Sequence, residues 1–437
     1  MNLNKNQLIF IGVAGFIIVL IGLVFAGVLP GLRQTGGGSG GPNKIQAKLN
    51  FWGAGDKSDD YSLAISAFKT NYPNVEINYR SFNNFDDYQT ALLDALAAGN
   101  GPDIFMIRNT DLPRNLNKIV AVPAVRFSLL NLRGSFPQIV ESDFATQNAL
   151  YALPLSIDTL AMIYNRDILA SKGVALPPAT WEDFKNDIPK LTTTDQNNKL
   201  LSAGAGIGTA KNIANAADIL SFLMLQTGTQ MTSADFRSAT FASPEGLNAL
   251  NFYTQFGNSS KKTYTWNNSF PDSIESFANE KVAMIFGYAS DIGKIKERNA
   301  FLNFAVTPAP QPIEAKKLVT YGHYFGYAVS RQSRNSAIAW DFIIHLTTNE
   351  VGVNDYVLKT KKPPALLSLV NQYAGDPSLG VFAKQILTAR SWPQIDADQI
   401  SALFKTLIDS VIINGADPMK SLRQAQDSVS QLMAKIQ

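Results

Sequence analysis

One stretch indicates the fold: residues 85–108, with the sequence FDDYQTALLDALAAGNGPDIFMIR. Its first half predicts a helix that Asp86 could cap, because apolar side chains recur there at helical spacing, at Tyr88, Ala91, Leu92, Ala95 and Leu96. Gly99 and Gly101 should end this helix. Residues 104–107 form a continuous apolar run, which is typical of a strand buried on both faces.

The residues before this stretch repeat the same alternation. Residues 48–52 predict a strand, and Tyr61, Ala64, Ile65 and Phe68 follow it at helical spacing. Tyr72 and Pro73 should break that helix, and the alternating residues of 75–79 predict another strand. Strand, helix, strand, helix and strand in this order indicate a parallel α/β layer.

Polar segments follow each of the three predicted strands, at residues 52–57, 81–84 and 108–111. In open α/β sheets, ligands bind outside the carboxyl ends of the strands. These segments could also be ordinary solvated connections. Because all three should lie at one edge of one sheet, we favour a binding site.

Five segments in order resemble family 1 extracellular solute-binding proteins, which include the maltose-binding group. The segments span the chain from about residue 44 to its end: Tyr88–Ile104, Tyr151–Pro154 with Leu160–Asp167, Pro178–Phe184, Phe277–Met284, and residues 337–350 with Lys362–Pro364. The resemblance implies an α/β, two-lobed, periplasmic-binding-protein-like fold whose hinged lobes close on a small ligand. It also implies delivery of a carbohydrate to the permease subunits of an ABC importer by a monomeric protein that is not an enzyme.

Three parts of the chain are expected. Residues 1–33 are a membrane anchor, residues 34–43 are a Gly/Ser-rich linker, and residues 44–437 are the solute-binding body. Within the body, lobe 1 should comprise about 44–156 plus 292–332, and lobe 2 about 157–291 plus 333–437. The segment 154–159 is the expected hinge.

The anchor is predicted from residues 8–29, LIFIGVAGFIIVLIGLVFAGVL, which carry no charge. As a helix they would span about 33 Å, enough for a bilayer core. A cleaved signal peptide is the alternative, with a small-residue site at 24–26. The flexible linker and the absence of a lipid-accepting cysteine favour an uncleaved helix that holds the body on the outer face of the cytoplasmic membrane.

Composition excludes several other chemistries. The 437 residues include no cysteine and two histidines, so thiolate metal sites and disulfides are excluded and a multi-histidine metal centre is not expected. The net charge of +3 gives no field for nucleic acid. Gly204–Gly208 precedes no clear phosphate-binding helix, so we expect no dinucleotide and no other cofactor.

A neutral polyol needs flat apolar surfaces for its C–H faces and polar groups for its hydroxyls. The expected aromatic and ring residues of the cleft are Trp52, Trp266, Tyr288, Tyr321, His323, Tyr324 and Trp392. The expected polar residues are Asp56, Lys57, Asn83, Arg108, Asn109, Asp111, Asp158, Asn212, Asn215 and Arg390. Asp56, Lys57 and Asp158 also match ligand positions of the maltose-binding group. Any of these residues could instead cap a helix or fill a core.

Other residues are predicted to be structural. Trp181 and Trp340 should lie in the core, Thr180 and Asp183 should cap a helix, and His345 should be packed. Glu280 stands where the family usually has glycine, which leaves the conformation of that turn open.

Two further functions remain open. A membrane-tethered sensor of the same fold would pass its closed state to a partner and would have the same sequence features. A secreted glycosidase would need paired carboxylates, but the adjacent aspartates at 59–60 and 86–87 look like solvated helix starts.

Overall fold

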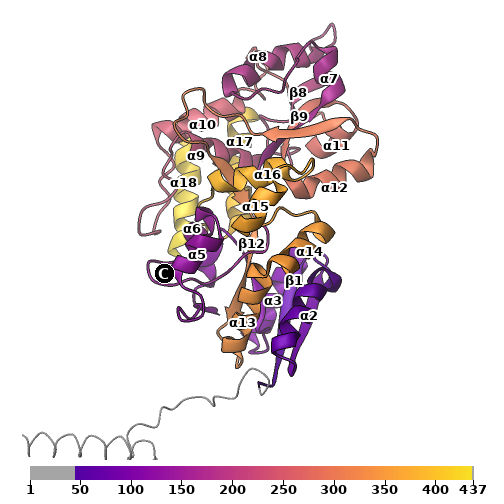
Figure 1. Cartoon of the computed structure of the whole chain (residues 1–437). Helices are drawn as coiled ribbons and strands as arrows, with labels where there is room; N and C mark the ends of the chain where they lie inside the picture. Colours follow the sequence, from indigo (N-terminus) through magenta and orange to yellow (C-terminus); the bar gives the residue numbers. More distant parts are fainter. Residues whose placement is uncertain (1–44, 436–437) are drawn as a thin grey trace, which may run out of the picture.

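Two five-stranded sheets form the centres of two lobes in the computed structural model, which describes residues 45–435 (Figure 1). The first sheet has the order β2-β1-β3-β12-β4. The bounds of these strands are β1 (Ala47–Ala54), β2 (Val75–Phe82), β3 (Ile104–Arg108), β4 (Ile119–Val120) and β12 (Phe325–Ser330). β1 is parallel to β2 and β3, whereas β12 is antiparallel to β3 and β4.

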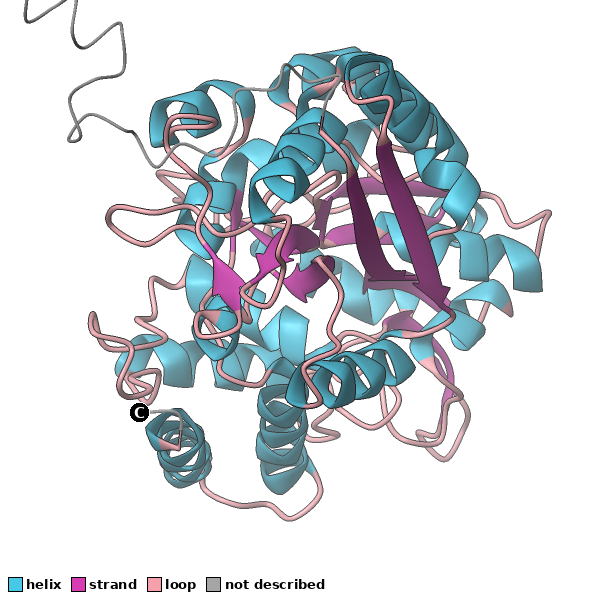
Figure 2. Cartoon of the chain, turned by 90° about the horizontal axis from the view of Figure 1, so that it is seen from below, coloured by secondary structure: helices cyan, strands magenta, loops and turns pink. Residues whose placement is uncertain are grey.

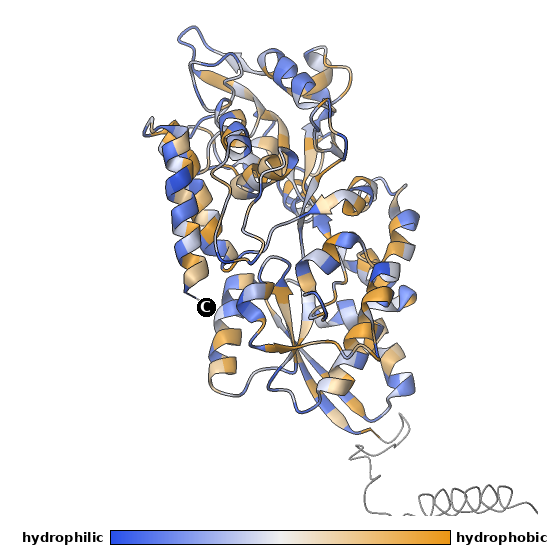
Figure 3. Ribbon diagram, turned by 90° about the vertical axis from the view of Figure 1, so that its left-hand side faces the viewer, coloured by the Kyte–Doolittle hydropathy of each residue, from blue (hydrophilic) through white to orange (hydrophobic). Residues whose placement is uncertain are grey.

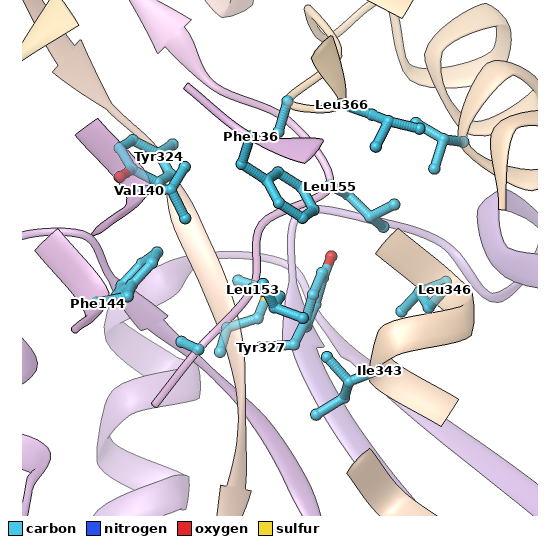
Figure 4. Packing of buried hydrophobic residues seen from close by; sticks show 14 of the residues in the cluster. Phe136, Val140, Phe144, Leu153, Leu155, Tyr324, Tyr327, Ile343, Leu346 and Leu366 are labelled. Carbon is cyan, nitrogen blue, oxygen red and sulfur yellow. The ribbon is translucent and has the colours of Figure 1, made fainter. Parts of the chain in front are cut away.

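Helices from both halves of the chain belong to this first lobe. They are η2 (Ser58–Tyr61), α2 (Ser62–Asn71), α3 (Phe85–Ala97), α4 (Leu112–Asn115), α5 (Leu129–Ser135), α6 (Gln138–Phe144), α13 (Ser336–Thr348), α14 (Glu350–Thr360), α15 (Leu367–Tyr373), α16 (Gly380–Gln385) and η3 (Ile386–Thr388). In the core, Leu153 and Leu155 lie beside Tyr327 of β12 and Ile343 of α13 (Figure 4).

The second lobe surrounds the sheet β10-β6-β9-β8-β7. Its strands are β6 (Ala161–Asn165), β7 (Thr193–Thr194), β8 (Leu200–Ala205), β9 (Val282–Gly287) and β10 (Phe304–Pro308). Its helices are α7 (Arg166–Ser171), α8 (Trp181–Leu191), α9 (Ala216–Gln226), α10 (Pro244–Thr254), α11 (Ser273–Ala278), α12 (Ala289–Arg298), α17 (Ala397–Ile412) and α18 (Pro418–Ala434). Helices enclose the strands (Figure 2), and α18 turns a hydrophobic face inward and a hydrophilic face outward (Figure 3).

A small third sheet marks the hinge. Its order is β13-β11-β5, with β5 (Asp158–Thr159), β11 (Thr320–His323) and β13 (Ala389–Arg390). Each strand lies where the chain passes from the core of one lobe to that of the other, between Ile157 and Leu160, Tyr321 and Tyr324, and Ala389 and Trp392. Three connections therefore link the lobes, and each contributes a strand to this sheet.

The predicted α/β layer is confirmed, with one correction at a helix start. β1, α2, β2, α3 and β3 follow in the expected order. Asn84, rather than Asp86, caps α3, because the Asn84 side-chain oxygen accepts the N–H of Asp87 at 2.8 Å. The predicted N-cap Thr180 is confirmed, with Thr180 Oγ1 accepting the N–H of Asp183 at 3.1 Å.

The predicted lobe boundaries in the second half of the chain are wrong. The segment 292–308 belongs to lobe 2, because β10 pairs with β6 there. Most of 333–388 belongs to lobe 1, because the apolar faces of α13 and α14 fill the core beneath its sheet. The chain thus returns to lobe 1 later, and stays longer, than the sequence suggested.

Two turns show why particular backbone conformations are required. Glu280 adopts a positive φ of 57°, the conformation that glycine takes most easily, so the turn is retained without the glycine. At Gly208, φ is 109° and an added Cβ would lie 2.2 Å from the nitrogen of Gly257. Glycine is therefore required at position 208 because the backbone of Gly257 passes close to it. This is consistent with a structural role for the glycine-rich segment.

The predicted anchor, residues 8–29, lies outside the described residues. Among residues 45–435, no helix is long and apolar enough to cross a membrane. The predicted core residues Trp181 and Trp340 are buried, and His345 packs against Phe68 with ring centroids 5.5 Å apart.

Candidate functional site

The hinge forms the floor of a cavity of about 310 Å³ between the lobes. Lobe 1 contributes the loops after β1 and β2, lobe 2 contributes the start of α12, and the hinge contributes β5 and the end of β11. The lining residues are Ala54, Gly55, Asn83, Asn84, Phe85, Ser156, Asp158, Ser290, His323, Tyr324, Phe325 and Lys362. The carboxyl ends of the first two strands therefore do face a cavity, as the α/β pattern indicated.

A second cavity of about 150 Å³ shares His323 with the first. It lies between the end of β3 in lobe 1 and helices α9 and α17 in lobe 2. Its polar lining includes Arg108, Thr110, Asp218, Ser221, Tyr321, His323, Gln394, Asp398 and Ser401. The two cavities and His323 define what we call the cleft.

Lys362 is the cation at the larger cavity, and its ammonium forms an ion pair with Asp56. The Asp56 carboxylate also accepts the hydroxyls of Tyr61 at 2.7 Å and Tyr356 at 2.9 Å. Burial raises the pKa of both tyrosines well above the usual value, so they remain protonated donors. This cluster of Asp56, Lys362, Tyr61 and Tyr356 is called the Asp56 cluster below.

Asp158 is the carboxylate on the hinge side of the larger cavity. It accepts the backbone N–H groups of Ala289 at 2.9 Å and Ser290 at 3.1 Å, which are the first two residues of α12. An acceptor at a helix N-terminus satisfies free N–H groups and interacts favourably with the helix dipole. Burial nevertheless raises the pKa of Asp158 to about 6.

The smaller cavity contains a second ion pair, which crosses between the lobes. Arg108, at the end of β3, lies 2.7 Å from Asp398 in the first turn of α17. The guanidinium also stacks over the ring of Phe85, 4.2 Å from its centroid. Arg108 thereby connects the two cavities through Phe85.

At the centre of the cleft, the ring of His323 packs against the buried Tyr288, whose hydroxyl is held by a polar contact. Tyr288 donates its hydroxyl to Asp218 at 2.7 Å, and its ring centroid lies 5.5 Å from that of His323. Burial lowers the pKa of His323, which keeps the imidazole neutral at pH 7. The centre of the cleft thus presents uncharged rings beside paired charges.

Buried hydrogen bonds fix the hinge behind the cleft. The Asp143 carboxylate accepts from Tyr324 Oη at 2.7 Å, from Asn109 Nδ2 at 3.0 Å and from the Ser391 hydroxyl. These partners follow β11, β3 and β13, so one carboxylate of α6 ties together segments of two hinge connections and the end of β3. Burial raises the pKa of Asp143 to about 6.

Residues 64–380 match the model of the bacterial extracellular solute-binding protein family, which covers more than half of the chain. The chain belongs to this family. The resemblance seen in the sequence is thereby confirmed, and the family places the solute-binding body outside the cytoplasm. Its members are binding proteins rather than enzymes.

Individual relatives of this solute-binding protein share modest identity over most of its length. The chain is 24% identical over 332 residues to a maltotriose-binding protein of Pyrococcus abyssi, covering 74% of this chain and 67% of that one. It is 22% identical over 415 residues to a galactooligosaccharide-binding protein of Bacillus subtilis, covering 89% and 90%. Among solved structures, the sugar-binding protein MalE of Xanthomonas citri is similar, with a TM-score of 0.72, 17% identity and coverage of 89% and 98%. This likeness supports the two-lobed fold.

Seven of the residues predicted from the sequence lie at or next to the cleft. Asn83, Asp158, His323 and Tyr324 line the larger cavity, and Arg108 and Tyr321 line the smaller one together with His323. Tyr288 lies next to the cleft, with its ring packed against that of His323. Asp56 reaches the cavity only through Lys362, because its own side chain is 3% exposed.

Other predicted residues hold the backbone or the core of the solute-binding protein together. Trp266 is fully buried against Phe270, and Trp392 is buried against Phe404 in the core of lobe 2. The side chains of three asparagines bond backbone carbonyl groups: Asn109 that of Gly322, Asn212 those of Asn267 and Phe270, and Asn215 that of Phe286. These aromatic and amide side chains serve the packing of the lobes.

The remaining four predicted residues occupy other structural positions. Asp111 is buried at the start of α4, and Arg390 donates to the carbonyl of Ala389 within the hinge sheet. Lys57 is exposed and precedes η2, with its N–H donating to Asp60. Trp52 packs against Phe82 beneath the Arg80 guanidinium.

Several cleft residues were absent from the sequence prediction. They include Phe85, Asp218, Ser221, Ser290, Gln394, Asp398 and Lys362, whereas Asn84 and Ser156 belong to segments that the sequence predicted as the site edge and the hinge. For Lys362 a signal existed, because Lys362-Pro363-Pro364 was among the segments resembling the family. For Asp398 and Gln394 there was none, since α17 reaches the cleft only through the tertiary fold.

Within residues 45–435, no group of three His, Cys, Asp or Glu side chains is placed to hold a metal ion.

Proposed function

We propose that this protein captures a neutral carbohydrate in the cleft and delivers it to an ABC importer. One observation carries the proposal: the charged side chains that line the cleft have partners of their own. Arg108 pairs with Asp398, Lys362 pairs with Asp56, Asp158 binds the start of α12, and Asp218 binds Tyr288. In such a site each charged group is already engaged by a partner, so the remaining hydrogen-bonding capacity suits hydroxyls rather than free ions.

The aromatic surfaces of the cleft support the same ligand class. Phe85, His323 and Phe325 line the larger cavity, and Tyr288 packs against His323. Flat rings pack against the C–H faces of a sugar while hydroxyls reach the polar rim. The relatives named above bind maltotriose and galactooligosaccharides, which adds support for an oligosaccharide.

Hinge closure would complete the site. Three connections with two- to four-residue strands join the lobes, so small backbone rotations there can change the width of the cleft. A ligand that contacts Lys362 on one side and Ser290 on the other would bind the closed state better and shift the population toward it. The closed form would then be recognised by the permease subunits.

The proposal includes the location and state of the protein. A helix over residues 8–29 would tether the body to the outer face of the cytoplasmic membrane, with residues 34–43 as the tether. The receptor would act as a monomer. A sensor with the same anchor would bind the same ligand but would need no permease.

A thermal-shift screen tests the ligand class. The panel contains maltotriose, galactooligosaccharides, amino acids, polyamines and inorganic anions. We expect one of the sugars to raise the melting temperature and to be recovered intact after hours, because ligand binding to the native state stabilises it. A shift with charged ligands alone would contradict the carbohydrate proposal, and sugar hydrolysis would favour a glycosidase.

A further inference from the structure

We infer that Lys362 is a ligand-contacting residue of the cleft and that Asp56 is the residue that positions it. The inference rests on the proposed function and deepens it, because it names the group that lobe 1 presents to the sugar. It also reverses the expectation from the sequence, in which Asp56 and Lys57 were to touch the ligand themselves.

Asp56 is too enclosed to contact a ligand. Its side chain is 3% exposed, and both carboxylate oxygens have partners: Lys362 on Oδ1, and the hydroxyls of Tyr61 and Tyr356 on Oδ2. The Tyr61 hydroxyl lies a further 2.9 Å from that of Tyr327. A carboxylate surrounded in this way orients its donors and has little capacity left for a sugar hydroxyl.

Lys362, in contrast, reaches the cavity. Its side chain is 33% exposed and lines the same cavity as Asp158, Ser290 and His323. An ammonium has three N–H donors, and the Asp56 carboxylate uses one of them. The other donors can serve ligand hydroxyls on the exposed side.

The backbone on both sides of Lys362 fixes where its side chain starts. Lys361 ends α14 in the left-handed conformation, with φ of 56°, which turns the chain sharply. On the other side of Lys362, the carbonyl of Pro363 accepts the N–H of Ile157 at 3.1 Å. Lys362 is therefore held between the end of a helix and the first hinge connection, and the Tyr356 ring lies 5.8 Å from its ammonium.

The pairing also defines what the ammonium can recognise. The adjacent carboxylate cancels its charge at longer range, so the N–H groups act mainly as oriented hydrogen-bond donors. A neutral hydroxyl fits this arrangement, whereas an acidic sugar would meet the nearby Asp56 and Asp158 carboxylates. We therefore expect Lys362 to contribute affinity for neutral sugars and little preference for acidic ones.

Calorimetric titration of the full chain in detergent micelles tests the contact, with maltotriose and galactooligosaccharides as probes. Lys362→Met should weaken binding about 10- to 100-fold, as expected when a charged hydrogen-bond donor is lost. Lys57→Met is the matched control and should bind within about twofold of wild type, because Lys57 does not line the cleft. Equal affinity of Lys362→Met and wild type would overturn the inference while leaving the proposed function intact.

A double-mutant cycle tests the positioning role of Asp56. Asp56→Asn should weaken binding in the wild-type background but have almost no further effect when Lys362 is already Met. Additive losses would contradict positioning through Lys362. Circular dichroism checks folding of each variant, and Tyr356→Phe, which keeps both charged partners, replaces Asp56→Asn if that variant does not fold.

Lysine methylation followed by mass spectrometry gives a result that does not depend on the ligand class. Lys362 should be modified more slowly than Lys57 in the free protein, and Asp56→Asn should raise its rate. Equal rates in wild type and Asp56→Asn would overturn the positioning role even if no sugar binds. If wild type binds no sugar in the panel, the proposed function fails, and this measurement still decides the role of Asp56.

Discussion

Two buried carboxylates, Asp56 and Asp143, each bind a residue that lines the larger cavity, but they are stabilised in different ways. In lobe 1, Asp56 has a cation, Lys362, together with two tyrosine hydroxyls. At the hinge, Asp143 is bound by uncharged donors from Tyr324, Asn109 and Ser391. Counter-charge offsets the cost of burying Asp56, whereas hydrogen bonds alone must offset the cost of burying Asp143. The hinge should therefore respond to pH, and the lobe 1 face should respond to loss of its cation.

The largest expected effect comes from removing the charge of Asp143. Its pKa in the folded protein is about 6, against 3.8 for the unfolded chain. Its contribution to stability is complete below pH 3.8 and is lost as pH rises to 6, by about 3 kcal/mol in total. Asp143→Asn does not titrate, so it should gain about 3 kcal/mol relative to wild type between pH 3 and pH 8.

Urea denaturation at several pH values measures this difference. Asparagine fits the site, because its oxygen can accept from Tyr324 and Asn109 while its amide donates to the Ser391 hydroxyl. Glu141→Gln, on the same helix, should show the opposite pH dependence, because Arg133 lowers the pKa of Glu141. A pH-independent difference between Asp143→Asn and wild type would show that hydrogen bonds fully offset the burial of this carboxylate.

The second prediction concerns the tyrosine at the hinge. Tyr324→Phe removes a 2.7 Å hydrogen bond to Asp143, so it should cost about 2 kcal/mol at pH 7.5. The loss should shrink to about 1 kcal/mol at pH 4.5, where Asp143 is protonated, because hydrogen bonds to neutral groups are weaker. The same urea titrations at the two pH values provide the measurement, and an equal loss at both would contradict a charged partner at neutral pH.

The third prediction removes the equivalent hydroxyl from the lobe 1 side. Tyr356→Phe should cost about 1.5 kcal/mol at pH 7.5, less than Tyr324→Phe, because Lys362 and Tyr61 still compensate Asp56. Tyr72→Phe is a matched control, since its more exposed hydroxyl lies 3.3 Å from Asp341 and should cost under about 0.5 kcal/mol. A greater loss for Tyr356→Phe than for Tyr324→Phe would reverse the comparison between the two carboxylates.

The sequence predicted the α/β layer of lobe 1 because its signals are local. Apolar periodicity over residues 85–97 and the apolar run over 104–107 determine secondary structure without reference to distant parts of the chain. The hinge sheet gave no such signal. Its strands have two or four residues each and form only when three distant segments meet.

The residue types of the site were easier to predict than their positions. Tryptophan suits both a sugar and a core, and burial of Trp266 in lobe 2 could not be separated from exposure by spacing alone. Asp56 lies in the first loop, as predicted. Its side chain nevertheless turns away from the cavity to bind Lys362, Tyr61 and Tyr356, which spacing alone could not indicate. The lobe boundary failed for a similar reason, since the apolar faces of α13 and α14 do not indicate which sheet they cover.

The smallest expected effect separates an exposed ion pair from a buried hydrogen bond by its dependence on salt. Asp398 is 51% exposed and pairs with Arg108 across the lobes, so Asp398→Asn should lower the free energy of unfolding by about 0.5 kcal/mol at low salt. Near 1 M salt the difference should vanish, because the Debye length falls to about 3 Å. The cost of Tyr324→Phe should persist there, since its buried hydrogen bond is hardly screened. Glu76→Gln, from the exposed pair with Lys48, should show no effect at either salt concentration. If Asp398→Asn retained its cost at high salt, the contact would hold the lobes by packing or hydrogen bonding rather than by charge. The ion pair and the buried hydrogen bond of Tyr324 would then respond to salt in the same way.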